Sequence, residues 1–552
     1  MTSAEPAPPA RLQRVDLLLL AGLTVVAFVL RYFSPLMPDL FVRPLSGPPV
    51  SNCVRSTPID PQGTPGTLCG LAYPFNKGYP QPDGSLSPSD GQVFDEIYFP
   101  VFAHDDLKGI AYFDPEPPLA KLIIAAGEWG WGAWRVVFQG ACPAVGKCDI
   151  ADLGFNPFGW RIAACLFGTL CVPLMYLLAW RLRPDRFFAF AAAFLANLDG
   201  MFFVQSRIGM IDIFPIFFIL LAYFLFLVHW QSRTPRESLL TLFALGLVLG
   251  IAIASKWIAL AAWASMLFFL GMRFLRRHLD LSVGDWSWGR GEGPGLPGGA
   301  PLRPYLVVAL AAFVDIPVLI YVASWIPFFT RGQFHAHWEL LFSQPGRVLG
   351  DIGQYNADAY TYHANLTETH PYGSPWFSWP FLWRPVLYYA EYTGLGFDAF
   401  TGRPLVALMN DLGNPWIWWT SLPALLLMPY YVFKERSFPA ALISVGFISQ
   451  YLPWARITRV IFLYHMFGGL FFMILALAFV LARLARSDAE VRIGGLQLGL
   501  SGRQLAWSHL VVTTCFFAFF YPLWTALPLS DQAYFGSPPG LIPGKFWFPS
   551  WL

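Results

Sequence analysis

The chain has 552 residues, of which 56% are hydrophobic and only 13% are charged. Soluble domains carry roughly 25% charged residues, so this composition excludes a soluble globular protein and predicts an integral membrane protein. The formal net charge of +2 provides no overall attraction for nucleic acid. We therefore expect the lipid bilayer, and no nucleic acid, as a partner.

Apolar runs of about 20 residues, the length that crosses a bilayer as a helix, recur along the chain. An Ala/Pro-rich tail, residues 1–14, precedes the first run, and we expect it to be disordered and cytoplasmic. The first run lacks a small-residue cleavage site, so we interpret it as a retained span and not as a removed signal peptide. We predict about eleven transmembrane helices, at 15–33, 158–181, 187–204, 208–230, 238–254, 257–275, 304–325, 415–433, 438–453, 459–482 and 507–527.

The positively charged residues predict the orientation of these helices, because short cytoplasmic loops carry an excess of Lys and Arg. Such residues gather on one side of the predicted spans, at Arg11, Arg14, Arg181, Arg183, Arg186, Arg233, Arg236, Arg273, Lys434, Arg436, Arg483 and Arg486. We expect that side to be cytoplasmic and the protein to lie in the cell membrane. The N-terminus is then inside, and the odd number of spans places the C-terminus outside.

Two long loops would face away from the cytoplasm. The predicted organisation is an N-terminal transmembrane module at 15–325 that includes loop 34–157, a second loop at 326–414, and a C-terminal module with an outer tail at 415–552. Within the first loop, residues 117–138 are apolar and contain three tryptophans, which predicts a helix lying along the membrane surface.

Four of the seven cysteines lie in the first loop, as the neighbouring pairs Cys53 with Cys69 and Cys142 with Cys148. An oxidising compartment favours disulfides, so two local disulfides are expected, with four free thiols as the alternative. No spacing of Cys and His in the chain resembles a zinc site.

Acidic residues mark a candidate site in the same loop. Asp95 and Glu96 are adjacent, and the stretch Asp114-Pro115-Glu116-Pro117-Pro118-Leu119-Ala120-Lys121 follows shortly after. A carboxylate held at a membrane surface costs free energy, which points to a functional site. The alternative is that these residues are ordinary solvated loop acids.

Several cations lie on the outer side, at or inside the ends of predicted spans, where topology does not require them. They are Arg161, Arg207, Lys256, Arg456 and Arg459. Such cations are costly near hydrocarbon unless they are paired or face a polar cavity. Asp199 and Asp212 flank Arg207 and are candidates for structural ion pairs with it, whereas a cluster of these cations could instead bind a lipid phosphate.

The second loop contains His370-Pro371-Tyr372 and Ser374-Pro375-Trp376. Dense aromatic residues with Pro and His suit the wall of a groove around a sugar or peptide, and they suit interfacial packing as well.

The order of these motifs resembles the protein O-mannosyltransferases, members of the GT-C class of glycosyltransferases. The motifs are Asp95-Glu96, Asp114 to Lys121, Gly159-Trp160-Arg161, Leu198-Asp199-Gly200, Ser206-Arg207, Ile211-Asp212, Ser255-Lys256-Trp257, His370-Pro371-Tyr372 and Gly413-Asn414-Pro415. The resemblance implies an all-α polytopic GT-C fold. Loop 326–414 is too short for the β-trefoil insert of eukaryotic members, so a prokaryotic type is expected.

The resemblance also implies an activity, an inverting transfer of mannose from polyprenyl-phosphate-mannose to Ser or Thr hydroxyls of exported proteins. Asp95 would be the general base, with Glu96 beside it in the site. Arg161, Lys256 and Arg207 would hold the donor phosphate, while contacts to the acceptor or the sugar would come from Asp114, Glu116, Lys121, His370 and Tyr372. The family usually has His where this chain has Glu116.

No cofactor or metal is required by this scheme, although Asp95, Glu96 and Asp114 could together offer oxygen ligands to a divalent ion. Two other functions stay open. One is a GT-C transferase that glycosylates a lipid such as lipid A, like the aminoarabinose transferases. The other is a transporter, against which we find no paired broken helices and no repeat symmetry.

Overall fold

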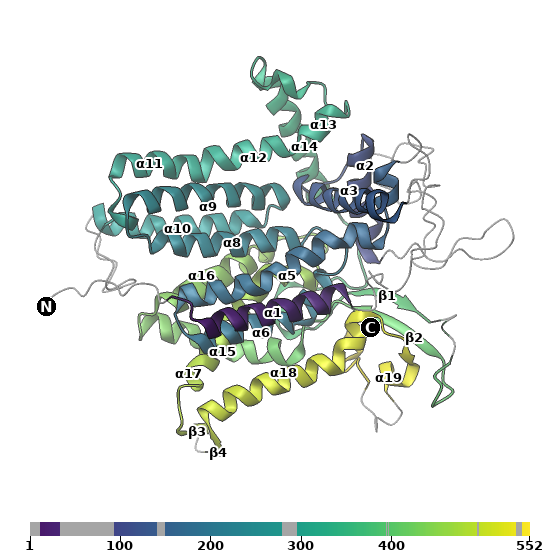
Figure 1. Ribbon diagram of the computed structural model, residues 1–552, viewed down its shortest axis with the longest axis vertical. Coiled ribbons are helices and arrows are strands. Elements are labelled where there is room, and N and C mark those ends of the chain that lie inside the picture. Colours follow the sequence, from purple (N-terminus) through teal and green to yellow (C-terminus); the bar gives the residue numbers. More distant parts are fainter. Residues whose placement is uncertain are drawn as a thin grey trace.

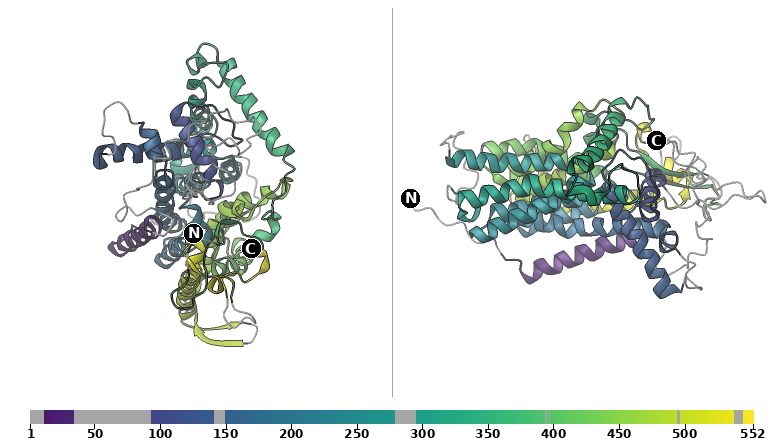
Figure 2. Two further views of the ribbon diagram at one scale, coloured as in Figure 1. Left: turned by 90° about the vertical axis from the view of Figure 1, so that its right-hand side faces the viewer. Right: turned by 90° about the horizontal axis from the view of Figure 1, so that it is seen from above.

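The computed structural model describes residues 11–33, 93–140, 149–278, 295–392, 395, 397–493, 496–536 and 544–552. Within these residues, seven helical segments are long and apolar enough to cross a membrane. They are α1 (Arg14–Tyr32), α5 (Pro157–Leu182), α8 (Ile213–Trp230), α9 (Pro235–Ser255), Leu302–Thr330, Leu463–Leu484 and α18 (Gly502–Thr525). Most of them run roughly parallel (Figures 1 and 2). The prediction of a mainly helical, multi-pass membrane protein is confirmed.

Two of the seven segments are composite. Leu302–Thr330 contains α11 (Leu302–Leu310), the π-helical turn η4 (Ala311–Asp315), α12 (Ile316–Ser324) and α13 (Ile326–Thr330), and Leu463–Leu484 contains η8 (Leu463–Met466) and α17 (Phe467–Leu484). Other helices of the bundle, which are not among the seven segments, are α6 (Arg186–Asn197), α7 (Gly200–Gln205), α10 (Ala259–His278), α15 (Pro415–Phe433) and α16 (Phe438–Tyr451). The predicted spans 187–204, 257–275, 415–433 and 438–453 lie on these other helices, so the count of about eleven spans stays a prediction.

The predicted span 187–204 is interrupted at Asp199. Its carboxylate accepts a hydrogen bond from the Phe202 backbone N–H at 3.0 Å and thereby caps the start of α7. Asp favours such N-cap positions because its side chain satisfies an N–H group that a helix start leaves free. A Cβ atom on the following Gly200 would lie 2.0 Å from the Trp524 ring, so only glycine fits where α7 begins.

The connections at one end of the bundle form small helices, and we call this end the loop end. They are η2 (Phe94–Ile97), α2 (Phe99–Lys108), α3 (Leu119–Gln139), α4 (Ile150–Gly154), η5 (Trp338–Leu341), α14 (Pro345–Asn365) and η6 (Trp376–Phe381). Helix α3 matches the predicted helix at 117–138, with Trp131 buried and stacked on the exposed Trp134. It begins directly after Pro117-Pro118, because proline is tolerated at a helix start but not in its interior.

A small antiparallel sheet also lies at the loop end and was not predicted. Its strands are β1 (Leu387–Glu391), β2 (Leu405–Asn410) and β5 (Leu529–Ser530), in the order β1-β2-β5. Ala390 pairs with Leu408, and a β-bulge separates Leu387 from Tyr389. Figure 1 shows β1 and β2 at the same end of the molecule as α2 and α3.

Further elements lie at the two ends of α18, the last long helix. A hairpin of β3 (Glu490–Ile493) and β4 (Leu496–Ser501) precedes α18, while α19 (Asp531–Phe535) and η9 (Pro549–Trp551) follow it. The cysteines of the two predicted disulfides, Cys53, Cys69, Cys142 and Cys148, lie outside the described residues, as do residues 1–10 of the tail.

Candidate active site

A buried ion pair joins the acidic motif to the membrane bundle. Glu96 is fully buried, and its Oε1 accepts hydrogen bonds from Arg161 Nε at 2.7 Å and from the Gly209 backbone N–H at 2.6 Å. Its Oε2 accepts from a terminal guanidinium nitrogen of Arg161 at 2.5 Å and from the Val93 N–H at 2.9 Å. Arg161 belongs to the start of α5, so this pair fixes η2 onto a transmembrane helix.

Asp95, next to Glu96, is placed differently. It is half-buried, and its carboxylate makes no hydrogen bond or ion pair with any residue that the structure describes. Burial is the largest influence on its pKa, followed by the negative charge of Asp212. The negative charge of Asp114 also raises this pKa, whereas the positive charge of Lys256 lowers it. The net effect is a pKa of about 7 for Asp95. The result is an unpaired carboxylate close to other charged groups.

Lys256, directly after α9, lies between two carboxylates. Its Nζ is 2.7 Å from Asp212 Oδ1 and 3.8 Å from Glu116 Oε1. Only 15% of the Lys256 side chain is exposed, so the ammonium group is largely shielded from water. The structure thus brings Asp95, Glu116, Asp212 and Lys256 into one cluster, as their mutual electrostatic influence also indicates.

The predicted pairing of Arg207 with Asp199 and Asp212 is wrong. Asp212 pairs with Lys256, and Asp199, besides capping α7, accepts hydrogen bonds from Asn414 N–H and Trp418 Nε1. Arg207 is fully buried. One of its terminal nitrogens donates to the Trp524 carbonyl oxygen at 3.1 Å, and its guanidinium carbon lies 4.6 Å from the centre of the Phe203 ring. Nearness in sequence therefore did not decide these pairs.

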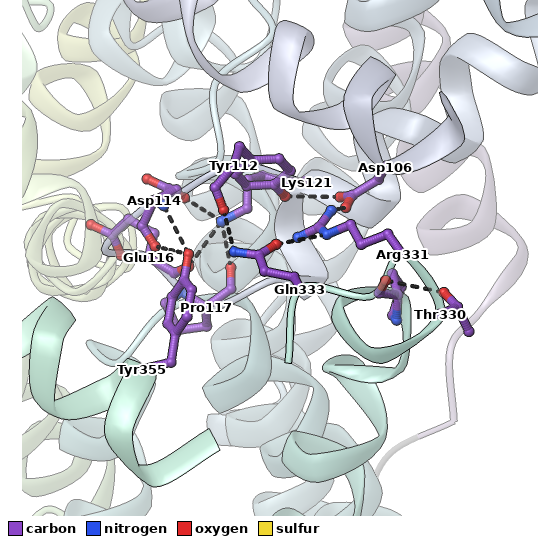
Figure 3. Close-up of polar contacts among 11 residues, drawn as sticks. Asp106, Tyr112, Asp114, Glu116, Pro117, Lys121, Thr330, Arg331, Gln333 and Tyr355 are labelled. Atoms are coloured by element: carbon purple, nitrogen blue, oxygen red, sulfur yellow. Dashed lines mark hydrogen bonds and ion pairs between the residues drawn. The ribbon is translucent and has the colours of Figure 1, made fainter. Parts of the chain in front are cut away.

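Residues of the second acidic stretch, 114–121, bond to one another (Figure 3). Lys121 is fully buried, and its Nζ contacts the Asp114 carboxylate and the carbonyl oxygens of Glu116, at 2.8 Å, and Pro117, at 3.2 Å. Tyr355 of α14 accepts a hydrogen bond from the Asp114 N–H at 2.9 Å. Asp114 and Lys121 therefore stabilise the loop, and the expected contacts to acceptor or sugar do not fit their geometry. The Glu116 carboxylate instead faces Lys256.

The segment that includes α13 and α14 is fastened to this loop by a second ion pair (Figure 3). Arg331 pairs with Asp106, and its guanidinium lies 3.7 Å from the centre of the Phe328 ring. Gln333 Nε2 donates to the Tyr112 carbonyl oxygen at 2.6 Å. The second long loop is thus anchored on the first one beside the charged cluster.

Arg459 also belongs to the site. The sequence indicated only that this cation lies unusually at the end of a predicted span, and gave no role for it. It is half-buried and forms no ion pair with a carboxylate in the described part of the chain. Its charge acts on Lys256 of the cluster and on His363 of α14. Arg459 therefore adds an unpaired positive charge beside Lys256.

His370 and Tyr372 lie farther out. His370 is exposed; its Nδ1 accepts a hydrogen bond from the Tyr372 N–H at 3.2 Å, and its ring meets Phe462 at 5.1 Å. Phe462 stacks on Tyr464, which in turn contacts Phe94, the neighbour of Asp95. The two residues thus reach the cluster only through other aromatic rings, and their contact with an acceptor stays a prediction.

The three carboxylates considered for a divalent ion do not converge on a common point. Glu96 and Asp114 are each paired with a cation, Arg161 and Lys121, and only Asp95 is left without one. Among the described residues the geometry therefore offers one carboxylate without a partner next to positive charge, and no set of convergent oxygen ligands.

The Glu96–Arg161 pair makes a first prediction. Glu96→Gln removes the charge that balances Arg161, and breaking a buried pair in this way costs about 3–5 kcal/mol. Thermal unfolding in detergent should therefore begin at a clearly lower temperature. Glu435→Gln, which breaks the half-exposed pair with Arg483, is the matched control and should have little effect. Removing both buried charges, with Arg161→Met added, should recover part of the loss; equal unfolding midpoints for Glu96→Gln and Glu435→Gln would contradict the assignment.

Comparisons with known proteins agree with the resemblance seen in the sequence. The family model described as dolichyl-phosphate-mannose-protein mannosyltransferase matches residues 86–331, and that of the C-terminal four-transmembrane region of protein-O-mannosyltransferase matches 348–537. A polyprenol-phosphate-mannose–protein mannosyltransferase of Corynebacterium glutamicum is 28% identical, over 85% of this chain and 89% of its own length. One of the same name from Mycobacterium tuberculosis is 25% identical, over 85% and 88%.

The fold points the same way. The chain is similar to a chain of the S. cerevisiae protein O-mannosyltransferase Pmt1-Pmt2 complex bound to the sugar donor, with a TM-score of 0.62 and 15% identity, over 95% of this chain and 92% of that one. This likeness confirms the predicted GT-C fold. With two family models that together span both halves of the sequence, the chain belongs to the protein O-mannosyltransferase family.

Proposed function

We propose that this protein transfers mannose from polyprenyl-phosphate-mannose to Ser or Thr hydroxyls of exported proteins, at the extracytoplasmic face of the cell membrane. The observation that carries the proposal is Asp95, a half-buried carboxylate without a partner among the described residues, beside the cations Lys256 and Arg459. The names of the bacterial relatives supply the donor and the protein acceptor, and they favour this reading over a lipid acceptor or a transporter.

Asp95 would act as the general base. A general base must be unprotonated at the working pH and must also bind a proton strongly. Both conditions are best met when its pKa lies near that pH. The pKa of Asp95, raised to about 7, meets both conditions. Its carboxylate would take the hydroxyl proton of the acceptor while that oxygen attacks the anomeric carbon from the face opposite the phosphate. One carboxylate suffices for such an inversion, and no covalent intermediate is needed.

Lys256 and Arg459 would stabilise the negative charge that grows on the departing lipid phosphate. Fixed charges aimed at a site of developing charge are often the largest contribution to catalysis. Arg161 is a weaker candidate than expected because its guanidinium binds Glu96, and Arg207 is fully buried against Trp524 and Phe203. We therefore assign Arg161 to holding the loop and the phosphate contact to Lys256 and Arg459.

The distribution of charges supports an extracytoplasmic site. The end of the bundle opposite the loop end carries Arg186 paired with Asp16, Arg486 paired with Asp185, and Arg483 paired with Glu435. An excess of arginine is typical of the cytoplasmic side. The start of α1 lies at that end, and the loop end would then face the exported proteins. Residues 549–552 also lie at the loop end, where Trp551 Nε1 donates a hydrogen bond to the Leu382 carbonyl oxygen at 2.7 Å.

The direct test is transfer by the purified protein. With labelled polyprenyl-phosphate-mannose and a Ser/Thr-rich peptide, label should enter the peptide, and Asp95→Asn should lower the rate by about 10²–10⁴-fold. Asp488→Asn, which changes an exposed acid far from the site, is the control. Label found in lipid would favour the lipid-acceptor alternative, and flux of solute without sugar transfer would favour a transporter. Asp95→Asn with wild-type transfer would eliminate the proposed base.

The proposal also predicts the dependence of the rate on pH. Because the unprotonated Asp95 acts, kcat/KM should rise with pH through a midpoint near 7, the pKa of Asp95 in the free enzyme. The negative charge of Asp212 raises that pKa, so Asp212→Asn should move the midpoint to lower pH. Glu435→Gln should leave the midpoint in place. An unchanged midpoint in Asp212→Asn would show that another group titrates.

The loop before α17 offers a matched pair of arginines. Arg459 is half-buried near Lys256, whereas Arg456 is exposed. Arg459→Gln should lower kcat by about 10²-fold, the usual effect of removing one group that stabilises developing charge, and Arg456→Gln should remain close to wild type. Equal activities of the two variants would count against a role of Arg459 at the phosphate.

A further inference from the structure

Phe94, directly before Asp95, has a strained backbone. Its φ angle is +48°, in the left-handed region that bulky residues rarely adopt, and such strain persists only when the surrounding structure enforces it. The surroundings that do so are aromatic. The Phe94 ring stacks on Tyr388 of β1, with ring centres 4.1 Å apart and planes 11° apart, and meets Tyr464 edge-on at 6.1 Å.

Tyr388 is itself held by a closed set of hydrogen bonds. Its hydroxyl donates to Asp411 Oδ2 at 3.0 Å and accepts from Gln205 Nε2 at 2.7 Å. Gln205 Nε2 also donates to Asp411 Oδ2 at 3.1 Å. All three side chains are buried. They come from the end of α7, from β1 and from the residue after β2, so three elements distant in sequence fix one ring.

The direction of the Asp95 carboxylate depends on its two neighbours. No described residue bonds to that carboxylate, so the backbone alone aims it. On the C-terminal side the backbone is fixed by Glu96 and its pair with Arg161. On the N-terminal side it is fixed by Phe94 against Tyr388. Both supports are needed for the Asp95 carboxylate to keep one position.

We propose that Tyr388, Asp411 and Gln205 form a positioning network, which holds Phe94 in its left-handed conformation and thereby aims Asp95 at the acceptor hydroxyl. This inference rests on the proposed function. Tyr388 acts through its ring, because its hydroxyl is engaged by Asp411 and Gln205. None of the three residues is a catalytic residue, and each contributes by keeping the base in place.

The first test changes Tyr388 and the neighbouring Tyr389 in parallel. Tyr388→Leu removes the stacking and should lower kcat by about 10²-fold, the usual cost of misplacing a reacting group by about 1 Å, while KM for donor and peptide stays nearly unchanged. Among the described ring contacts, Phe94 meets Tyr388 and Tyr464 but not Tyr389, the next residue on β1, so Tyr389→Leu is the control. Tyr388→Phe keeps the ring but loses its hydrogen bonds, so its kcat should lie between those of wild type and Tyr388→Leu.

The second test asks whether hydrogen bonds at Asp411 matter. Asp411→Asn retains an oxygen that can accept from Tyr388 and Gln205, whereas Asp411→Leu cannot. The asparagine variant should therefore recover much of the kcat that the leucine variant loses. Phe94→Leu combined with Tyr388→Leu should lose no more than either alone, because both remove the same stacking contact.

The outcomes separate this inference from the proposed function. A wild-type protein without transfer would overturn the proposed function itself. If the wild type is active and Tyr388→Leu folds with an unchanged kcat, the network alone is overturned. A raised KM with an unchanged kcat would also overturn it, because Tyr388 would then be a substrate contact. If Tyr388→Leu fails to fold, the kcat values of the milder variants decide. The network predicts a lower kcat for Tyr388→Phe than for wild type, and a higher kcat for Asp411→Asn than for Asp411→Leu. The reverse order would overturn the proposal.

Discussion

The pair of Glu96 and Arg161 is the constraint on which the site depends. Both side chains are buried, and each would carry an uncompensated charge at high cost if the other moved away. The pair therefore ties η2 to α5 more firmly than backbone contacts alone would. Its effect on the chemistry is indirect, because it places the adjacent Asp95 without binding the Asp95 carboxylate. The proposed base would have to be held in position and still keep its oxygens available, and this arrangement is compatible with both needs.

The carboxylates of the loop end divide into paired and unpaired ones, and this division gives them different properties. Glu96, Asp114 and Asp212 are matched with Arg161, Lys121 and Lys256. Asp95, in contrast to these three, has no ion-pair partner among the described residues, and burial together with the negative charges of Asp212 and Asp114 raises its pKa. Glu116 adds a further negative charge 3.8 Å from Lys256. Two carboxylates, those of Asp212 and Glu116, therefore lie close to one lysine.

The sequence was sufficient for the parts of the structure that depend on local signals. Apolar runs predicted the helical bundle, and an adjacent Asp95-Glu96 followed by cations at span ends predicted where charges would gather. The partners could not be predicted, because Glu96 meets Arg161 across 65 positions and Lys256 meets Asp212 across 44. Asp199 carries a readable signal, since Asp is a favoured N-cap residue at the start of a helix, although its nearness to Arg207 in the sequence favours an ion pair. Tyr388 lies on a short bulged strand, whose pairing depends on residues far along the chain.

The supports around Asp95 also bear on what the acceptor has to supply. Arg161 of α5, Tyr355 of α14 and Tyr388 of β1 come from three different elements, and each fixes the loop through contacts between the protein's own residues. An enzyme that assembled its site only on binding would spend part of the substrate's binding energy on that step. A segment of an exported protein offers a hydroxyl and a backbone but few fixed side chains. If the proposed function holds, a site already fixed by its own ion pairs and aromatic stacking would leave most of that limited binding energy for orienting the hydroxyl toward Asp95.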